Sequence, residues 1–142
     1  MYERITIKQA LRRGFFCING PVMLIMFMPF GIAYGVHNLL PYLRPFLASD
    51  IIGFIDAICV TLSFLGFPAG WLWWSVSVPK WKLWAYSRVD NLLALKRAAV
   101  RAGLIWPDGS LFAKTEICSR EVRKQIQALE DAARPMADDD EI

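Results

Sequence analysis

The sequence predicts an all-α membrane protein, a two-span transmembrane helical hairpin with a small, mostly helical cytoplasmic C-terminal region containing a short turn or hairpin. Two uncharged stretches, residues 14–43 and 57–79, predict the spans, because about 20 apolar residues rise ~30 Å as a helix and can cross a bilayer. Residues 80–142, in contrast, carry 11 basic and 10 acidic side chains. A hydrophobic content of 56% over 142 residues is also high for one water-soluble core.

The first span follows a short basic segment. Residues 1–13 are expected to form a cytoplasmic N-terminus, and residues 14–79 the transmembrane hairpin. The first span covers about 15–36 and contains Pro21 and Pro29. Since each proline removes a backbone donor, we expect a kinked helix, with a candidate break near residue 20. The apolar run is too long for the core of a secretory signal and is expected to stay in the membrane.

The outer loop covers residues 38–50, and Ser49 or Asp50 is expected to cap the second span, about 51–74. Lysines and arginines gather before the first span and after the second, whereas the loop contains only Arg44. Because cytoplasmic flanks are enriched in basic residues, this asymmetry predicts that both termini are cytoplasmic. The expected location is therefore the inner (cytoplasmic) membrane, as a multi-pass protein.

Tryptophans and lysines cluster at the inner end of the second span. Side chains of these types favour the boundary between lipid and water, so the cluster is interpreted as an interfacial anchor. Its members are Trp71, Trp73, Trp74, Lys80, Trp81, Lys82 and Trp84.

Residues 80–134 form the basic cytoplasmic helical region. Its first helix, 81–103, is amphipathic, and its basic residues either follow from topology alone or dock a partner. The docking candidates are Arg88, Lys96, Arg97 and Arg101. So small a region is expected to fold against a surface, which is the membrane, another copy or a larger protein.

The sequence Pro107-Asp108-Gly109 predicts a turn, within either a small hairpin or a tight loop. A last helix is expected to begin near Thr115 or Ser119 and to end before Pro135. Residues 135–142 form an acidic tail that is expected to be disordered.

Small residues recur at four-residue spacing in both spans. Such spacing permits close backbone approach, either between the two spans or with another transmembrane subunit. The helix-packing candidates are Gly31, Gly35, Gly53, Ala57, Gly66 and Gly70. By depth in the membrane, the first pair is expected to face the second pair, and the third pair to lie level with Gly20.

Asn19 and Asp56 are the polar residues of interest within the spans. A carboxylate in a span is costly and tends to mark a pathway or a pairing. Asp56 lies at the interface or pairs with Arg44 or Tyr34, or else it binds a basic or hydroxyl group of a partner. Asn19 is expected to add an interhelical hydrogen bond.

Reactive groups are sparse in this sequence. The chain has one histidine, His37, and its three cysteines form no CxxC pair. The motifs of serine hydrolases, phosphate-binding loops and zinc proteases are absent, so no catalytic, cofactor-binding or metal-binding residue is predicted. The net charge of +3 suits anionic lipid headgroups, and no nucleic acid partner is expected.

These features favour a non-enzymatic inner-membrane structural or adaptor subunit of a multiprotein membrane assembly, such as a secretion, conjugation or transport machine. The expected partners are the lipid bilayer and other membrane or cytoplasmic subunits, and a second copy is a further possibility. The alternative is an immunity-type or regulatory membrane protein that binds a membrane-active toxin or a channel, using its outer loop. A small transport subunit that depends on Asp56 is a third possibility.

Overall fold

The computed structural model describes residues 3–134, in which every regular element is a helix. The helices are α1 (Ile7–Gly14), a π-helical segment (Phe15–Asn19), α2 (Gly20–Leu43), α3 (Ser49–Tyr86), α4 (Leu92–Arg101), a 3-10 helix (Phe112–Thr115) and α5 (Arg120–Ala133). The chain divides into a hairpin unit, Gly20–Trp73, and a terminal unit, Met1–Asn19 with Trp74–Ile142. The acidic tail predicted for residues 135–142 lies outside the described residues.

Two helical stretches, Ile7–Leu43 and Ser49–Tyr86, are long and apolar enough to cross a membrane, which confirms the two long apolar helices that the sequence predicts. Both are longer than the predicted spans. The first runs to Leu43 with Pro29 and Pro41 inside it, so the non-helical connection is residues 44–48 and not 38–50. The first stretch continues past residue 20, and its irregularity is the π-helical segment immediately before Gly20.

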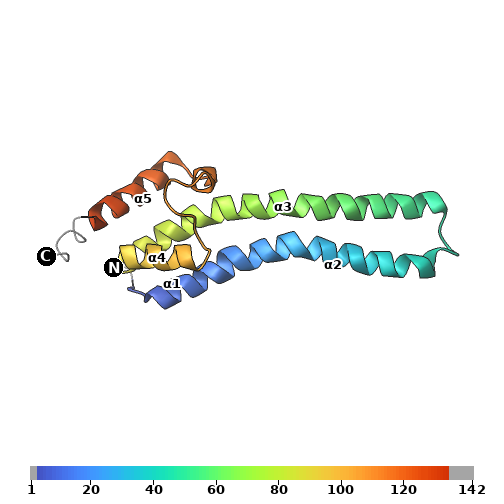
Figure 1. The fold of residues 1–142 in the computed structure, drawn as a ribbon, viewed down its shortest axis with the longest axis horizontal. Helices are drawn as coiled ribbons and strands as arrows, with labels where there is room; N and C mark the ends of the chain where they lie inside the picture. The colour runs from blue at the N-terminus through green and yellow to red at the C-terminus, as the bar shows by residue number, and fades with distance from the viewer. Residues whose placement is uncertain (1–2, 135–142) are drawn as a thin grey trace. The chain divides into compact units, whose positions relative to one another are not determined.

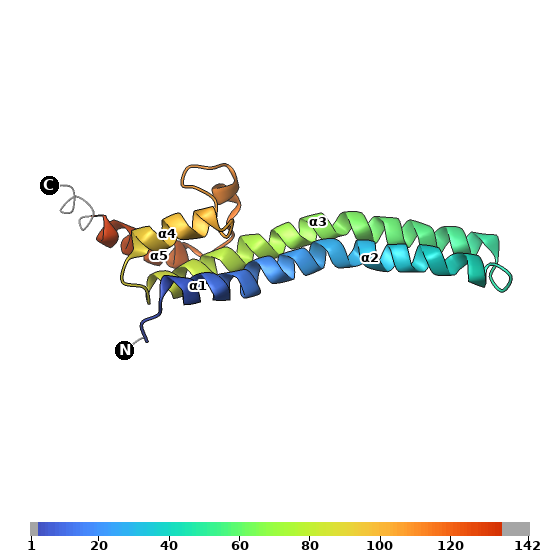
Figure 2. The ribbon, with the colours of Figure 1, turned by 60° about the horizontal axis from the view of Figure 1, so that its bottom comes forward.

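Within the hairpin unit, α2 and the first part of α3 lie side by side and antiparallel (Figures 1 and 2). Their less exposed positions recur at alternating spacings of four and three residues, a 3.5-residue repeat like that of paired helices in coiled coils. These positions are Val22, Met26, Pro29, Ala33, Val36 and Leu40 on α2, and Ile52, Asp56, Cys59, Ser63, Gly66 and Gly70 on α3. We call this contact line the hairpin seam.

The terminal unit has its own core, formed by side chains from both ends of the sequence. It combines α1 and the π-helical segment with the last part of α3, and with α4, α5 and their connections. The buried apolar side chains include Ala10, Ile18, Trp74, Val78, Trp81, Ala85, Leu92, Leu95, Ala99, Leu104, Ile105 and Ile126. Residues 80–134 were expected to fold against an external surface, and α1 with the preceding part of α3 supplies such a surface from within the chain.

The helix predicted over residues 81–103 is two helices. α3 continues through Pro79 and ends at Tyr86, where the Arg88 and Val89 amides donate to the Ala85 carbonyl. The Asn91 side chain then accepts from the Ala94 amide and begins α4. A side-chain oxygen that satisfies a free amide favours a new helix start over continuation of the old one.

Other predicted boundaries agree with the structure. Gly103 follows α4 with a φ of 67°, and Ser119 caps α5 by accepting from the Val122 amide. Gly109 has a φ of 80° in a turn closed by the Ser110 amide and the Pro107 carbonyl, at 3.2 Å. The turn leads into the 3-10 helix and not into a strand, so of the two predicted forms the tight loop is found.

Candidate functional site

The N-terminal segment is fastened to the last part of α3. The Trp81 indole nitrogen donates to the Ala10 carbonyl at 3.0 Å, and the Ile5 amide donates to the Arg88 carbonyl at 3.1 Å. Gly14 lies against the same indole, where a Cβ would come within 2.8 Å of Nε1. Glycine at this position therefore allows α1 and α3 to approach closely.

A buried ion pair joins α3 to the connection before α5. Lys82 Nζ lies 2.6 Å from Glu116 Oε1, and the two side chains are only 10% and 12% exposed. The adjacent Ile117 amide donates to the Ser75 carbonyl at 2.9 Å. Together these contacts fix residues 116–117 along one face of α3.

Lys96 of α4 lies between two carboxylates. Its Nζ is 2.5 Å from Asp108 and 3.0 Å from Glu130 of α5. Burial by itself would lower the pKa of Lys96, but the hydrogen bonds and charges of Asp108 and Glu130 outweigh it and raise that pKa above its ordinary value. The lysine therefore holds α4, the turn and α5 together, and it is not available as a docking residue.

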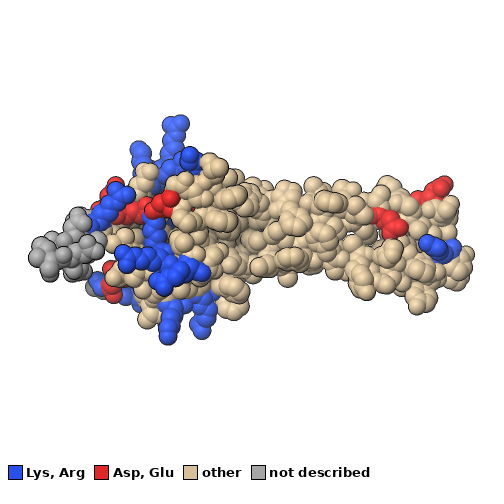
Figure 3. Space-filling model, viewed as in Figure 1, with Lys and Arg blue, Asp and Glu red and all other residues tan. Residues whose placement is uncertain are grey.

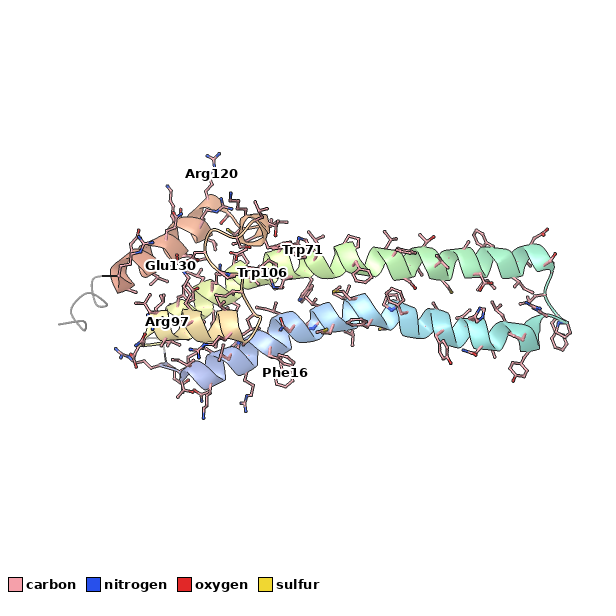
Figure 4. The ribbon with its side chains drawn as sticks, in the orientation of Figure 1. Phe16, Trp71, Arg97, Trp106, Arg120 and Glu130 are labelled. Atoms are coloured by element: carbon pink, nitrogen blue, oxygen red, sulfur yellow. The ribbon has the colours of Figure 1, made fainter. Side chains whose placement is uncertain are left out.

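The other three docking candidates differ in exposure. Arg97 and Arg101 are exposed, and Figure 4 shows Arg97 projecting away from α4. Arg88 is half-buried; it donates to the Trp84 carbonyl at 3.1 Å and lies 5.3 Å from the centre of the Trp84 ring. Two of the four predicted docking side chains are thus free to meet a partner.

The predicted interfacial anchor separates into two groups. Trp71, Trp73 and Lys80 are exposed, as an anchor requires. As whole residues, Trp74, Trp81 and Lys82 are 7%, 5% and 8% exposed, so they belong to the core of the terminal unit and offer little surface to lipid. Trp84 is half-buried beneath the guanidinium of Arg13, at 4.2 Å from the ring centre. The same residue types serve the boundary and the core, because tryptophan combines a large apolar ring with one donor.

An exposed apolar patch lies in the connection between α4 and α5. Trp106 stacks on Phe112 with ring centres 4.7 Å apart, yet the two side chains remain 40% and 46% exposed. Leu111 and Ile117 are 75% and 54% exposed. Large apolar side chains that are exposed within one short segment, two of them stacked, are typical of interaction surfaces. The sequence carried a signal for this patch in the apolar residues on both sides of Pro107-Asp108-Gly109.

Helix α5 adds exposed charge to the terminal unit. Arg120, Arg123 and Lys124 are exposed, and Arg120 points away from the helix in Figure 4. Figure 3 shows that basic side chains gather on the terminal unit, while most of the visible hairpin surface carries no charge.

The six helix-packing candidates fall into two classes. A Cβ on Gly66 would lie 2.9 Å from the Ile25 carbonyl oxygen, and one on Gly70 would lie 2.6 Å from Met26 Cγ. These two glycines therefore permit close packing of the hairpin, against residues 22–29 and not level with Gly20.

The four helix-packing candidates nearest the loop do not contact one another. A Cβ on Gly31, Gly35 or Gly53 would have no neighbour within 4 Å, and Ala57 is exposed. Gly31 lies two positions from both Pro29 and Ala33, and Gly35 lies two positions from Ala33 and one from Val36, so each is about 100° or more around the helix from these seam residues. They consequently occupy the face of α2 that is turned away from α3, so the predicted packing of this pair on Gly53 and Ala57 was wrong.

Asn19 and Asp56, the polar candidates of the predicted spans, have no side-chain hydrogen bond or ion pair with any residue of the described range 3–134. Asp56 is half-buried in the hairpin seam and makes no ion pair or hydrogen bond with the described residues, Arg44 and Tyr34 included. Gly66 of α3 lies beside Met26 of α2. Ten residues closer to the loop, the corresponding residues are Asp56 on α3 and Val36 on α2, so these two lie at the same level of the hairpin. Asn19 likewise forms no hydrogen bond between helices within residues 3–134.

No group of three or more His, Cys, Asp or Glu side chains within residues 3–134 is arranged to hold a metal ion. Comparisons with protein-family models, curated proteins and solved structures give no match to the chain. The fold alone therefore defines its class: an all-helical protein with two helices long and apolar enough to cross a membrane.

Proposed function

We propose that this chain is a non-enzymatic structural or adaptor subunit of a multiprotein assembly in the inner (cytoplasmic) membrane, with both termini in the cytoplasm. Secretion, conjugation and transport machines are assemblies of the proposed kind. The two long apolar helices support membrane insertion. The basic residues flanking both spans, against Arg44 alone in the loop, support the orientation.

The observation that carries the proposal is the open glycine face of α2. Gly31 and Gly35 are exposed, four residues apart, and point away from the helix with which α2 pairs in this chain. In a bilayer, small residues at this spacing let a second helix approach closely enough for extensive van der Waals contact. A helix of another membrane subunit is the partner that this face suits.

The terminal unit supports a second contact, with a cytoplasmic component. The stacked pair Trp106 and Phe112, with exposed Leu111 and Ile117 in the same connection, offers area for hydrophobic burial. Exposed basic side chains on α4 and α5 add charge for orientation. The internal ion pairs of Lys82 and Lys96 hold this surface in one conformation, which lowers the entropic cost of binding.

The role of the glycine face is tested by replacing its two glycines with larger residues. Gly31→Leu with Gly35→Leu in the full chain is expected to abolish copurification of a membrane partner in mild detergent, while the hairpin stays folded because neither position touches the seam. Gly53→Leu is the matched control, an equally open glycine on α3, and is expected to retain the partner. Purification of the unmodified chain as a clean monomer would contradict the proposal.

The orientation is tested separately with reporter fusions. Green fluorescent protein fused after Ile142 is expected to fluoresce, and alkaline phosphatase inserted after Pro45 is expected to be active. The reverse pattern would place the termini outside and exclude a cytoplasmic partner for the terminal unit.

An immunity-type protein that blocks a toxin or a channel is the second candidate. Two aromatic side chains at the loop end of the hairpin favour it, since Tyr42 and Phe46 are 76% and 83% exposed. Tyr42→Ser with Phe46→Ser would abolish protection under this alternative. Under the adaptor proposal, the same change leaves copurification of the partner intact.

A further inference from the structure

A cavity of about 430 Å³ lies within the terminal unit, between the N-terminal segment and the last part of α3. Three arginines line it, Arg4, Arg12 and Arg13, together with the amide side chain of Gln9. The one acidic side chain in the lining is Glu3. Arg4 is paired with Asp90, which leaves the guanidinium groups of Arg12 and Arg13 against the carboxylate of Glu3 and makes the cavity attractive to an anion.

Two of the three guanidinium groups are already positioned. Arg13 lies over the Trp84 ring, 4.2 Å from its centre, and Arg4 pairs with Asp90. Arg12 is exposed and has no polar partner among residues 3–134. Its donors are therefore free to bind a ligand, and a guanidinium fork matches the geometry of a phosphate group.

The rim of the cavity is apolar on one side. Phe16 lines it, is 68% exposed, and points outward from the π-helical segment in Figure 4. Phe16 also lies near the start of the uncharged stretch, residues 14–43, that leads into α2. A ligand that uses the whole site therefore combines an anionic head with an apolar tail.

We propose that this cavity binds the phosphate headgroup of an anionic phospholipid, with Arg12 and Arg13 as the principal contacts and Phe16 against the first part of an acyl chain. Basic pockets on the cytoplasmic side of membrane helices suit such headgroups. The site rests on the membrane location within the proposed function and is independent of the adaptor role.

The test is native mass spectrometry of the full chain in mild detergent, titrated with phosphatidylglycerol or with phosphatidylcholine. We expect preferential binding of phosphatidylglycerol, and a reduction of about tenfold in that preference for Arg12→Gln with Arg13→Gln, the loss of charge-assisted hydrogen bonds. Arg12→Gln alone guards against misfolding, since this exposed side chain has no partner to lose, and it is expected to weaken the preference in the same direction.

Arg97→Gln with Arg101→Gln is the matched control, because it removes the same charge from exposed positions of α4 that do not line the cavity. The control is expected to keep the lipid preference. An equal loss in the control would show that net charge alone attracts the lipid, and would overturn the site.

Inorganic phosphate distinguishes the source of the anion. If it displaces phosphatidylglycerol at equal concentration, the cavity is a site for soluble anions and the lipid proposal fails. The lipid titration uses the purified chain without a partner protein. Its result therefore does not depend on the outcome of the copurification experiment. A chain that is released from membranes by an alkaline wash would instead refute the shared membrane location.

Discussion

Lys82 Nζ lies 2.6 Å from Glu116 Oε1, joining α3 to a residue 34 positions later, and both side chains are almost completely buried. Because the pair is buried, removing one partner and removing both have different effects on the free energy of unfolding. Removing one partner leaves an uncompensated charge away from water, whereas removing both leaves none. The same contact shows why Lys82 is a poor interfacial anchor, since its charge is neutralised within the protein.

Lys82→Met is therefore expected to lower the free energy of unfolding of the terminal unit by about 3 kcal/mol. Lys82→Met combined with Glu116→Met should recover most of that loss, because apolar side chains of similar volume fill the same space. Thermal unfolding of the full chain in detergent, followed by circular dichroism, measures both changes. A double variant no more stable than the single one would contradict the buried-pair interpretation.

Gly66→Ala is expected to destabilise the hairpin by about 1 to 3 kcal/mol, because the added Cβ meets the backbone oxygen of Ile25 at 2.9 Å. Gly53→Ala is the control: its Cβ enters open space, and alanine is the better helix former, so no loss is expected. Titration with sodium dodecyl sulfate in mixed micelles compares the two. Equal effects at the two positions would show that the seam does not run through Gly66.

Tyr86→Phe is expected to leave stability within about 0.5 kcal/mol of the unmodified chain or to raise it. The ring is 3% exposed, and its hydroxyl has no hydrogen-bond partner among the described residues, so no bond is lost. Trp81→Phe is the contrast, because it removes the bond to Ala10 and part of a buried ring, at a cost of about 2 kcal/mol or more. The two midpoints of thermal unfolding should therefore differ clearly, and similar midpoints would count against this core.

The raised pKa of Lys96 predicts that the stability of the folded chain depends on pH in the alkaline range. Because its pKa is raised in the folded chain, the stabilisation is fully present below the usual lysine pKa of 10.5 and disappears as pH rises through the higher, folded value. The difference in unfolding temperature between the unmodified chain and Lys96→Met should thus be constant near neutral pH and shrink above 10.5. A difference that falls between pH 6 and pH 8 would exclude Lys96 as its source.

The sequence was sufficient to predict the helical class and the two long apolar helices. These depend on local composition, since more than twenty successive residues without charge leave few other structures. Ser119 and Gly103 were also read correctly, because a cap and a positive φ are local properties. Membrane orientation, the adaptor role and the partners remain predictions.

The faces of the helices could not be predicted in the same way. α2 and the first part of α3 are mostly apolar, and their few polar residues do not gather on one face, so no amphipathic pattern distinguishes the seam from the exposed surface. Gly31 and Gly66 therefore looked equivalent, although only Gly66 packs within the hairpin. Lys82 was misplaced for a related reason, because its partner Glu116 lies far away in the sequence.

The terminal unit draws α1 from the start of the chain and α4 and α5 from its end. A ribosome adds about 5 to 20 residues per second, so α1 waits several seconds before its partners are made. Until then the core that buries Ala10 and Ile18 is incomplete. The bond between Trp81 and Ala10 can form only once the last part of α3 has been synthesised. Completion of this unit thus requires α4 and α5, and a chain that stops before them leaves uncovered the apolar side chains of α1 and α3 that they help to bury.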